Sequence, residues 1–333
     1  MTAIAASYHD RVNVLQGMAP KDASPFDRPE WYALLAEAKP PLLAMASDGD
    51  KKAALALTRA NGRLEPLNHW YSFTWRQLAP RDAGGDRLLA SLATDLKTHT
   101  ARVTLSPVPD EDGSASRLET AFRTAGWIVH REQCDENHIL PVRGRTFAEY
   151  WAERPGRMRT TLKRKAKKVD VELLTRFDGA AWAAYEEIYA HSWKPAEDTP
   201  SILRAFAQAE GEAGRIRLAI ARHAGRPVAA QFWTVENGIA YIHKLAHLEE
   251  TSNLSAGTTL SAALFEHVID IDGVHLVDFG TGNDRYKADW MEKVRPRFLL
   301  DCLDSRQPRA WPPLIKRSVR QILTRLAPSG AES

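Results

Sequence analysis

Apolar residues in the first half of the chain occur first at helical spacing and then in short runs. The segment "DRPEWYALLAEAKP" has an aspartate and a proline at its start and places Trp31, Leu34 and Leu35 at helical spacing. Three apolar runs follow, "PLLAMAS", "KAALALTR" and "RLEPLNHWYS", separated by the turn sequences "DGDK" and "NGR". Beyond them lie a helical pattern at residues 88–96, "RVTLSPV", a second helical pattern at 118–125 and "WIVHREQCDENHILPV". The pattern predicts a helix, a three-stranded meander, and then helix, strand, helix and strand.

The second half follows a similar order. "VDVELLTRF" indicates a strand, and "AAWAAYEEIYAHSW" and "SILRAFAQAEGEAG" indicate two helices. A longer segment, "RIRLAIARHAGRPVAAQFWTVENGIAYIHKLA", predicts a three-stranded meander with turns at "AGRP" and "ENG". The helix "GTTLSAALFEHVID", the strand "HLVDFG", the helix "DRYKADWMEK" and the strand "RPRFLLDCL" are expected to complete this half.

The two halves also resemble each other in amino-acid sequence. "LLAMASDGDKKAALAL", from Leu42, aligns with "RLAIARHAGRPVAAQF", from Arg217, in one register. We interpret this as a tandem duplication of a unit of roughly 150 residues, while chance similarity between alanine-rich strands is the alternative. The predicted fold class is α/β (α+β), with two tandem domains, each a mixed, mostly antiparallel sheet flanked by helices. The expected boundaries are 1–145, 146–305, and a basic amphipathic C-terminal helix and tail at 306–333.

Composition describes a soluble globular protein of two domains. The chain has 333 residues, of which 44% are hydrophobic and 26% charged, and single cores stop growing near ~250 residues. Cys134 and Cys302 lie far apart and have no metal-ligand spacing, so neither a disulfide framework nor a zinc site is indicated. No secretory signal and no run of ~20 apolar residues is apparent. These features predict a cytoplasmic location.

Positive charge is concentrated in two segments, although the net charge is only +3. "GRMRTTLKRKAKKVDV" carries seven Lys or Arg between Arg157 and Lys168, with Met158 and Leu162 at helical spacing. It predicts a basic amphipathic helix, whose alternative interpretation is a solvated face. "PPLIKRSVRQILTRL" predicts a second one that docks on the body of the protein or lies on an anionic membrane surface.

Two further stretches suggest a binding site. "SAGTTLSAALFEHVI" joins a strand to a helix through small residues, so the backbone N–H groups of Gly257, Thr258 and Thr259 and the helix dipole would face an anion. Ser255 could add a hydrogen bond or could simply cap the helix. "VDFGTGNDRYKADWM" places an acid, a tyrosine, a lysine and a tryptophan just after a buried strand.

The order of elements resembles the GNAT acyltransferase fold, and the tandem arrangement resembles the FemAB-like group. "YIHKLAHLEE", "LSAGTTL" and "VDFGTGNDRYKADW" resemble the BioF2-like acetyltransferase domain, over about residues 150 to 305. The resemblance implies acetyl-CoA or another acyl-CoA as cosubstrate, with its pyrophosphate at the loop after Leu254 and its pantetheine beside Leu245. The usual GNAT loop has Gln or Arg where Leu254 stands, and Gly or Ala where Thr259 stands, which leaves room for a different acyl carrier.

Acyl transfer needs a proton acceptor for the attacking amine and an acid for the leaving thiolate. In GNAT enzymes a tyrosine acid often lies where Tyr286 lies, and a phenol is a suitable proton donor to a thiolate. Lys287 could bind an anion or stabilise the oxyanion. The alternative for this pair is an exposed helix start. His243 and Asp278 compete as general base, and a core histidine is the alternative for His243.

Acceptor recognition is expected from four residues. Strict alternation along "IAYIHKLAH" puts His243 and Leu245 on one face of the sheet and Lys244 on the other, where Lys244 could bind an acidic acceptor. The resemblance implies that the loop carrying His191 and Trp193 shapes the acceptor pocket, with a solvated loop as the alternative. It also places Arg164 near the substrate cleft as a clamp for phosphate or carboxylate.

The leading hypothesis is an N-acyltransferase that moves an acyl group, most simply acetyl, from acyl-CoA to a small-molecule amine by direct attack, with no metal. One alternative is a FemAB-like aminoacyl transferase that uses charged tRNA, whose backbone the basic helix would contact. The other is a binding protein that keeps the fold without catalysis, in surface polysaccharide assembly.

Overall fold

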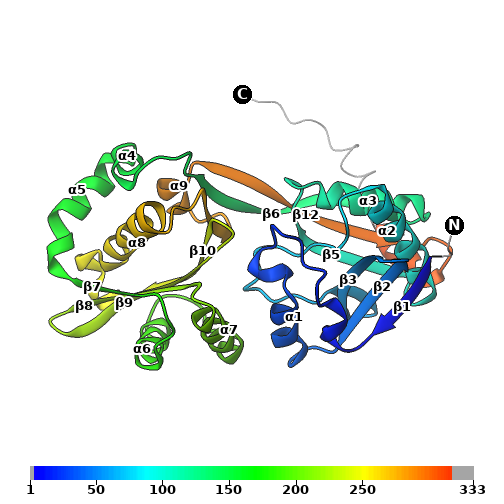
Figure 1. Cartoon of the computed structure of the whole chain (residues 1–333), viewed down its shortest axis with the longest axis horizontal. Coiled ribbons are helices and arrows are strands. Elements are labelled where there is room, and N and C mark those ends of the chain that lie inside the picture. The colour runs from blue at the N-terminus through cyan, green and yellow to red at the C-terminus, as the bar shows by residue number, and fades with distance from the viewer. Residues whose placement is uncertain (1–3, 317–333) are drawn as a thin grey trace. The chain divides into compact units, whose positions relative to one another are not determined.

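The computed structural model describes residues 4–316 and divides them into two compact units. Unit 1 contains residues 4–134 and 296–316 of these, and unit 2 contains residues 135–295. The expected basic C-terminal helix falls largely on residues 317–333 and so lies outside the described residues. Figure 1 shows the elements of each unit along the chain.

Unit 1 is a sheet in the order β1-β2-β3-β4-β5-β12 with helices packed on it. The β4–β5 pair is parallel and the other pairs are antiparallel. Helix α2 packs on β2 and β3. Asn61 and Gly62 have φ of 51° and 73°, the left-handed backbone that a tight turn between β3 and β4 requires. The bounds are β1 Ala5–His9, α1 Pro29–Ala36, β2 Pro41–Asp48, β3 Lys51–Ala60, β4 Arg63–Pro66, α2 Ala83–Asp95, β5 Arg102–Val108, α3 Ser114–Thr124 and β12 Lys293–Leu303.

Unit 2 is a sheet in the order β6-β11-β10-β9-β8-β7, in which only the β10–β11 pair is parallel. Trp233 of β9 packs on Phe265 of α8, while its neighbour Phe232 packs on Trp182 of α6. Adjacent strand residues face opposite sides, so α8 covers one face and α6 and α7 the other (Figure 1). The bounds are β6 Ile128–Pro141, α4 Phe147–Ala152, α5 Gly156–Lys165, β7 Asp170–Leu174, α6 Gly179–Ala190, α7 Pro200–Glu212, β8 Ile216–His223, β9 Arg226–Glu236, β10 Ile239–His247, α8 Ala256–Glu266, β11 Leu276–Thr281 and α9 Lys287–Trp290.

The predicted fold class is confirmed, with two tandem units of the same strand order. Both meanders form, as β2-β3-β4 and β8-β9-β10, and the similar sequences 42–57 and 217–232 each form one antiparallel hairpin. The helix expected from "DRYKADWMEK" is shorter than predicted, because α9 has only four residues.

The division into units differs from the expected boundaries in two places. Residues 135–141 of β6 pair with β11 in unit 2, and residues 298–303 of β12 pair with β5 in unit 1. Each unit therefore takes one strand of its sheet from the part of the sequence that we had assigned to the other. Sequence periodicity identified both strands but carries no information on their pairing partners.

Candidate functional site

The two parallel strands at the centre of unit 2 separate partway along their length. Ile239, Ala240 and Tyr241 of β10 pair with residues 276–278 of β11. Beyond Tyr241, β10 continues to pair with β9 as far as His247, and no further residue of β11 is paired with it. The separation leaves main-chain groups on this edge of β10 available to a ligand, since neighbouring strands otherwise satisfy them.

A cavity of about 340 Å³ lies in unit 2 and contains several of the predicted residues. Five residues of the sequence-based site line it: Trp193, Leu245, Gly257, Thr258 and Tyr286. Its other walls are Met158, His247, Ser261, Phe279, Asp289 and Trp290. The cavity thus joins the start of α8 to the start of α9, two segments that lie about thirty residues apart in the sequence.

The start of α8 has no side-chain cap. Ser255 has φ of +54°, and its side chain makes no capping hydrogen bond. Its Oγ instead accepts a hydrogen bond of 3.0 Å from Nζ of Lys165 in α5. The first amide groups of any α-helix lack partners within the helix, so those of α8 can bind a ligand. Helix capping by Ser255, the alternative considered from the sequence, is therefore wrong.

Gln231 fixes α8 at this position. Its Nε2 donates to the carbonyl of Gly257 at 3.1 Å and to Oγ of Ser261 at 2.7 Å. Thr259 is buried, and its hydroxyl donates back to the carbonyl of Ser255 at 3.5 Å. Thr259 therefore contributes its backbone at the start of the helix but is not among the residues that line the cavity.

Tyr286 contributes a phenol to the lining of the cavity. Its ring packs edge-on against Phe279, with 5.6 Å between the ring centroids. Tyr286 is 38% exposed, and the partial burial of its phenol, with a smaller effect of the Asp284 carboxylate, raises its pKa above the ordinary tyrosine value. The phenol is therefore protonated at neutral and moderately alkaline pH, as a proton donor must be.

Lys287 lies beside Tyr286 in the sequence but points elsewhere. Its Nζ donates to the carbonyls of Thr281 and Gly282, and its side chain is buried. Burial lowers the pKa of Lys287, although Asp284 opposes that shift. In this structure the lysine holds the loop before α9 and is not among the cavity residues, so its catalytic role stays a prediction.

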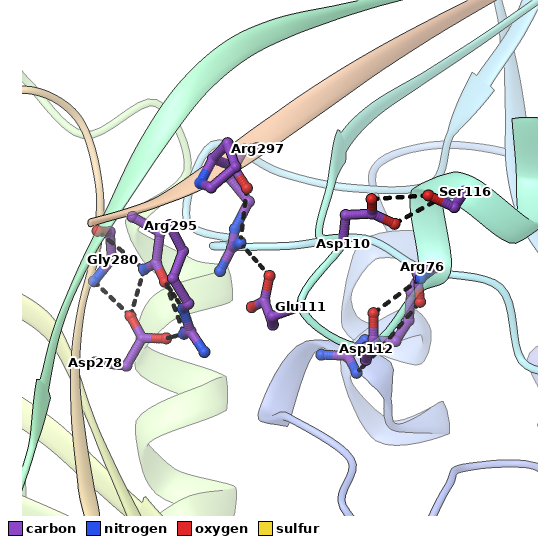
Figure 2. Close-up of polar contacts among 12 residues, drawn as sticks. Arg76, Asp110, Glu111, Asp112, Ser116, Asp278, Gly280, Arg295 and Arg297 are labelled. Carbon is purple, nitrogen blue, oxygen red and sulfur yellow. Dashed lines mark hydrogen bonds and ion pairs between the residues drawn. The ribbon is translucent and has the colours of Figure 1, made fainter. Parts of the chain in front are cut away.

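Asp278, a proposed general base, is held by three donors (Figure 2). Its Oδ1 accepts from Nδ2 of Asn137 at 2.6 Å and from the amide of Gly280 at 2.8 Å, and its Oδ2 accepts from Arg295 at 3.0 Å. The carboxylate thus braces the bend that follows β11. No part of the sequence pattern pointed to Asn137 or Arg295, because their proximity depends on strand pairing.

A bulge in β10 changes which residues share a face. The pairing with β9 shifts between Ile242 and Lys244. As a result His243 and Lys244 both face α6 and α7, while Leu245 turns toward α8 and the cavity. The strict alternation that we expected along this strand is therefore wrong beyond His243, since a bulge inserts one unpaired residue.

His243 and Lys244 are each engaged on that face. Nε2 of His243 lies 2.8 Å from Oγ1 of Thr234, and its ring stacks on Phe232. Lys244 is buried, and its Nζ lies 3.0 Å from Oε1 of Glu197. Burial lowers the pKa of Lys244 to about 8, although the Glu197 carboxylate opposes the shift. Neither residue lines the cavity, and Glu197 is a partner that the sequence analysis missed.

The remaining predicted residues lie in or near the basic helix α5 and the loop after α6. Arg164 is exposed, whereas Lys165 reaches the start of α8. Arg157 pairs with Asp289, a cavity residue, at 2.6 Å. The ring of His191 lies against the carbonyl of Glu187 at the end of α6, at 2.9 Å. Trp193 packs on His247 in the cavity wall, 4.2 Å between ring centroids.

His247, the last residue of β10, also lines the cavity. Burial is the main cause that lowers the pKa of His247 from its ordinary value. Its imidazole is therefore neutral near pH 7 and can accept a proton.

Among residues 4–316, no group of three or more His, Cys, Asp or Glu side chains could hold a metal ion. Within the same residues, no helix is long and apolar enough to cross a membrane.

Comparisons with known proteins support the fold. Residues 156–288 match the family model of the acetyltransferase (GNAT) domain. FemX is similar in structure, with a TM-score of 0.64, 10% sequence identity, and coverage of 92% of this chain and 96% of that one. L-PGS from Bacillus licheniformis has a TM-score of 0.55 at 12% identity, covering 89% of this chain and 96% of that one.

A tandem GNAT protein from the clavulanic acid biosynthesis pathway is also similar. Its TM-score is 0.52 at 14% identity, with coverage of 90% of this chain and 98% of that one. No curated protein sequence gives a significant match. At these identities the likenesses establish a FemAB-like tandem GNAT fold and leave substrates open.

Proposed function

From the premise that residues 156–288 form an acetyltransferase (GNAT) domain, we propose that the protein is an N-acyltransferase that uses acyl-CoA. One observation carries the proposal. A single cavity connects the uncapped start of α8, at Gly257 and Thr258, with the phenol of Tyr286. An anion-binding end and a proton donor are the two groups that a phosphate-bearing thioester requires.

In the proposed reaction the carrier's phosphates bind the amides at the start of α8, and its thioester lies between the separating strands. The amine nitrogen attacks the thioester carbonyl, the C–S bond breaks, and an amide forms. The thiolate takes the proton of Tyr286, and the amine gives up a proton to water or to His247. Neither Cys134 nor Cys302 is among the cavity residues, so we propose direct transfer without an acyl-enzyme.

The acceptor is proposed to enter beside Trp193, which is about half exposed and lines the cavity. Lys244, His191 and Arg164 remain proposed contacts for the acceptor or carrier, since none of them lines the cavity. His243 and Asp278 remain candidate bases, and the donors that hold them reduce their capacity to accept a further proton.

Three measurements test the proposal together. Native mass spectrometry of the purified protein identifies a carrier that co-purifies with it. Thermal shift with coenzyme A measures carrier binding, and thiol release from acetyl-CoA across a panel of amines measures turnover. Binding with turnover supports the proposal, whereas a thermal shift without turnover by any amine favours the non-catalytic alternative. The absence of any shift with coenzyme A would contradict an acyl-CoA carrier.

A second candidate function is aminoacyl transfer from charged tRNA. Arg159 and Arg164 of α5 are exposed, and no carboxylate of the described residues pairs with them. Such a basic surface suits a phosphate backbone, and binding would weaken steeply as salt increases. Retention of tRNA at low salt, with no thermal shift on coenzyme A, would favour this candidate.

A further inference from the structure

The start of α8 carries an electrostatic arrangement that is unfavourable without a ligand. The N-terminus of a helix holds the equivalent of roughly half a positive charge, and cations there are normally avoided. Lys165 nevertheless places its ammonium group 3.0 Å from Oγ of Ser255, the residue that precedes α8. No carboxylate of residues 4–316 lies within ion-pairing distance of Lys165. Two positive ends therefore face each other, and an anion between them would stabilise both.

Lys165 reaches this point because of its position in α5. Met158 lines the cavity from the same helix, and Lys165 follows it by two turns. Residues seven apart lie on one face of a helix, so α5 directs both side chains toward α8. The neighbouring Lys163 lies on the exposed side. A lysine thus occupies the position where an apolar residue would continue the packing against α8.

The loop itself lacks a cation for a phosphate. Leu254, the residue before Ser255, is apolar and buried, and residues 248–258 contain no lysine or arginine. Lys165 is remote in sequence from this loop, yet it supplies one cation with two N–H donors beyond the bond to Ser255. Gly257 and Thr258, at the same end of α8, line the cavity that holds Tyr286.

We propose that Lys165 of α5 binds a phosphate or pyrophosphate group of the acyl carrier at the start of α8, in place of a cation from the loop. This inference rests on the proposed function, because it concerns the start of α8, where Gly257 and Thr258 line the same cavity. Lys165 itself is not among the cavity residues and reaches the start of α8 through Ser255. Lys165 is a binding residue in this scheme and does not touch the reacting atoms.

The test compares Lys165→Gln with Lys163→Gln, a matched change on the exposed side of the same helix. Isothermal titration uses coenzyme A and, separately, inorganic pyrophosphate as probes. Loss of a charge-assisted hydrogen bond is expected to raise Kd for both probes about tenfold or more in Lys165→Gln. Lys163→Gln should change Kd by less than about twofold, and Lys165→Arg should recover part of the loss.

The outcomes separate this inference from the proposed function. If wild-type protein binds coenzyme A and Lys165→Gln binds both probes as Lys163→Gln does, the role of Lys165 is overturned and the acyl-CoA proposal survives. If wild-type protein binds only pyrophosphate, and does so through Lys165, the inference holds and the coenzyme A proposal fails. Binding of neither probe overturns both. Circular dichroism and melting curves confirm that each variant is folded.

Discussion

The two units differ in what lies beyond their parallel strand pair, β10 and β11 in unit 2 and β4 and β5 in unit 1. In unit 2, β10 and β11 separate and leave a cavity beside them. In unit 1, β4 ends at Pro66, and the chain beyond it bonds to β3, through Leu67 to Ala56 and through Leu78 to Ala54. The amide of Trp75 donates to Pro107 at the end of β5, and its Nε1 donates to Ala56 of β3, both at 2.8–2.9 Å. At the place that follows the parallel strand pair, unit 2 thus has a cavity, and unit 1 has its own chain.

The start of the next helix, α2 in unit 1 and α8 in unit 2, also differs between the two units. Asp82 caps α2, where its Oδ1 accepts from the amide of Gly85 at 2.8 Å and its Oδ2 pairs with Lys51 at 2.6 Å. A carboxylate of the chain therefore already occupies the anion position in unit 1. At α8 no carboxylate does so, and Lys165 approaches instead. This difference supports the proposal that the carrier binds in unit 2.

The largest expected effect comes from removing the aromatic residue that fills unit 1. Trp75 is 1% exposed, and Trp→Ala in a core typically costs about 3–5 kcal/mol of unfolding free energy. Trp75→Ala should therefore destabilise the protein strongly in urea unfolding. Trp70→Ala, at a residue that is 55% exposed, should cost less than about 0.5 kcal/mol. Equal effects of the two changes would show that residues 67–78 do not form a packed core.

Tyr286→Phe should affect catalysis and leave binding intact. General acid catalysis typically contributes about 10²-fold or more, so kcat for thiol release from acetyl-CoA should fall by about 10²-fold with little change in KM. Tyr8→Phe in unit 1, which loses a hydroxyl bond to Asp95, serves as the matched control and should keep kcat. A fall in kcat for both variants, or for neither, would remove Tyr286 from the mechanism.

Ser255→Asp places a carboxylate at the start of α8, as Asp82 does at the start of α2. An aspartate tolerates the left-handed backbone of this position, can pair with Lys165 and repels a phosphate. Kd for coenzyme A should rise about tenfold, while the melting temperature stays equal or rises. Ser255→Ala should weaken binding much less, because it adds no negative charge. Unchanged affinity in the aspartate variant would contradict an anion site there.

A further prediction concerns the pH dependence of stability and the lysine buried in unit 2, which has no counterpart in β4. The folded pKa of Lys244 is about 8, below its usual 10.5, so between these values the unfolded chain binds more protons and stability rises with pH. One such group contributes a slope of up to about 1.4 kcal/mol per pH unit. Urea unfolding of wild type and Lys244→Gln from pH 8 to 10 measures how the free energy of unfolding changes with pH. The variant should lack the rise that Lys244 contributes, and identical slopes in the two proteins would contradict the lowered pKa.

Local patterns in the sequence predicted much of the fold. Apolar spacing and turn residues indicated both meanders, and "NGR" and "ENG" mark turns where Asn61 and Asn237 adopt positive φ. The sequence similarity of 42–57 and 217–232 predicted the tandem units, because each segment forms a hairpin between residues that lie close together in the sequence. The sequence analysis also selected Gly257, Thr258 and Tyr286, which line the cavity, because their place follows from the order of strands and helices along the chain.

Tertiary structure decided what depends on contacts between distant segments. The bulge at His243 reversed the faces expected for Lys244 and Leu245, because pairing with β9, and not residue type, sets the register. Lys165 rather than Arg164 reaches α8, since the choice depends on how α5 packs.

The sequence by itself thus determined the order of the elements and the loops in which polar groups gather, because backbone preferences act over a few residues. Only the tertiary structure decided that β6 and β12 each complete the sheet of the other half, and that Trp75 lies beyond the parallel strand pair of unit 1 while a cavity beside Tyr286 lies beyond that of unit 2. These outcomes follow from packing between residues far apart in the chain, for which local periodicity carries no signal.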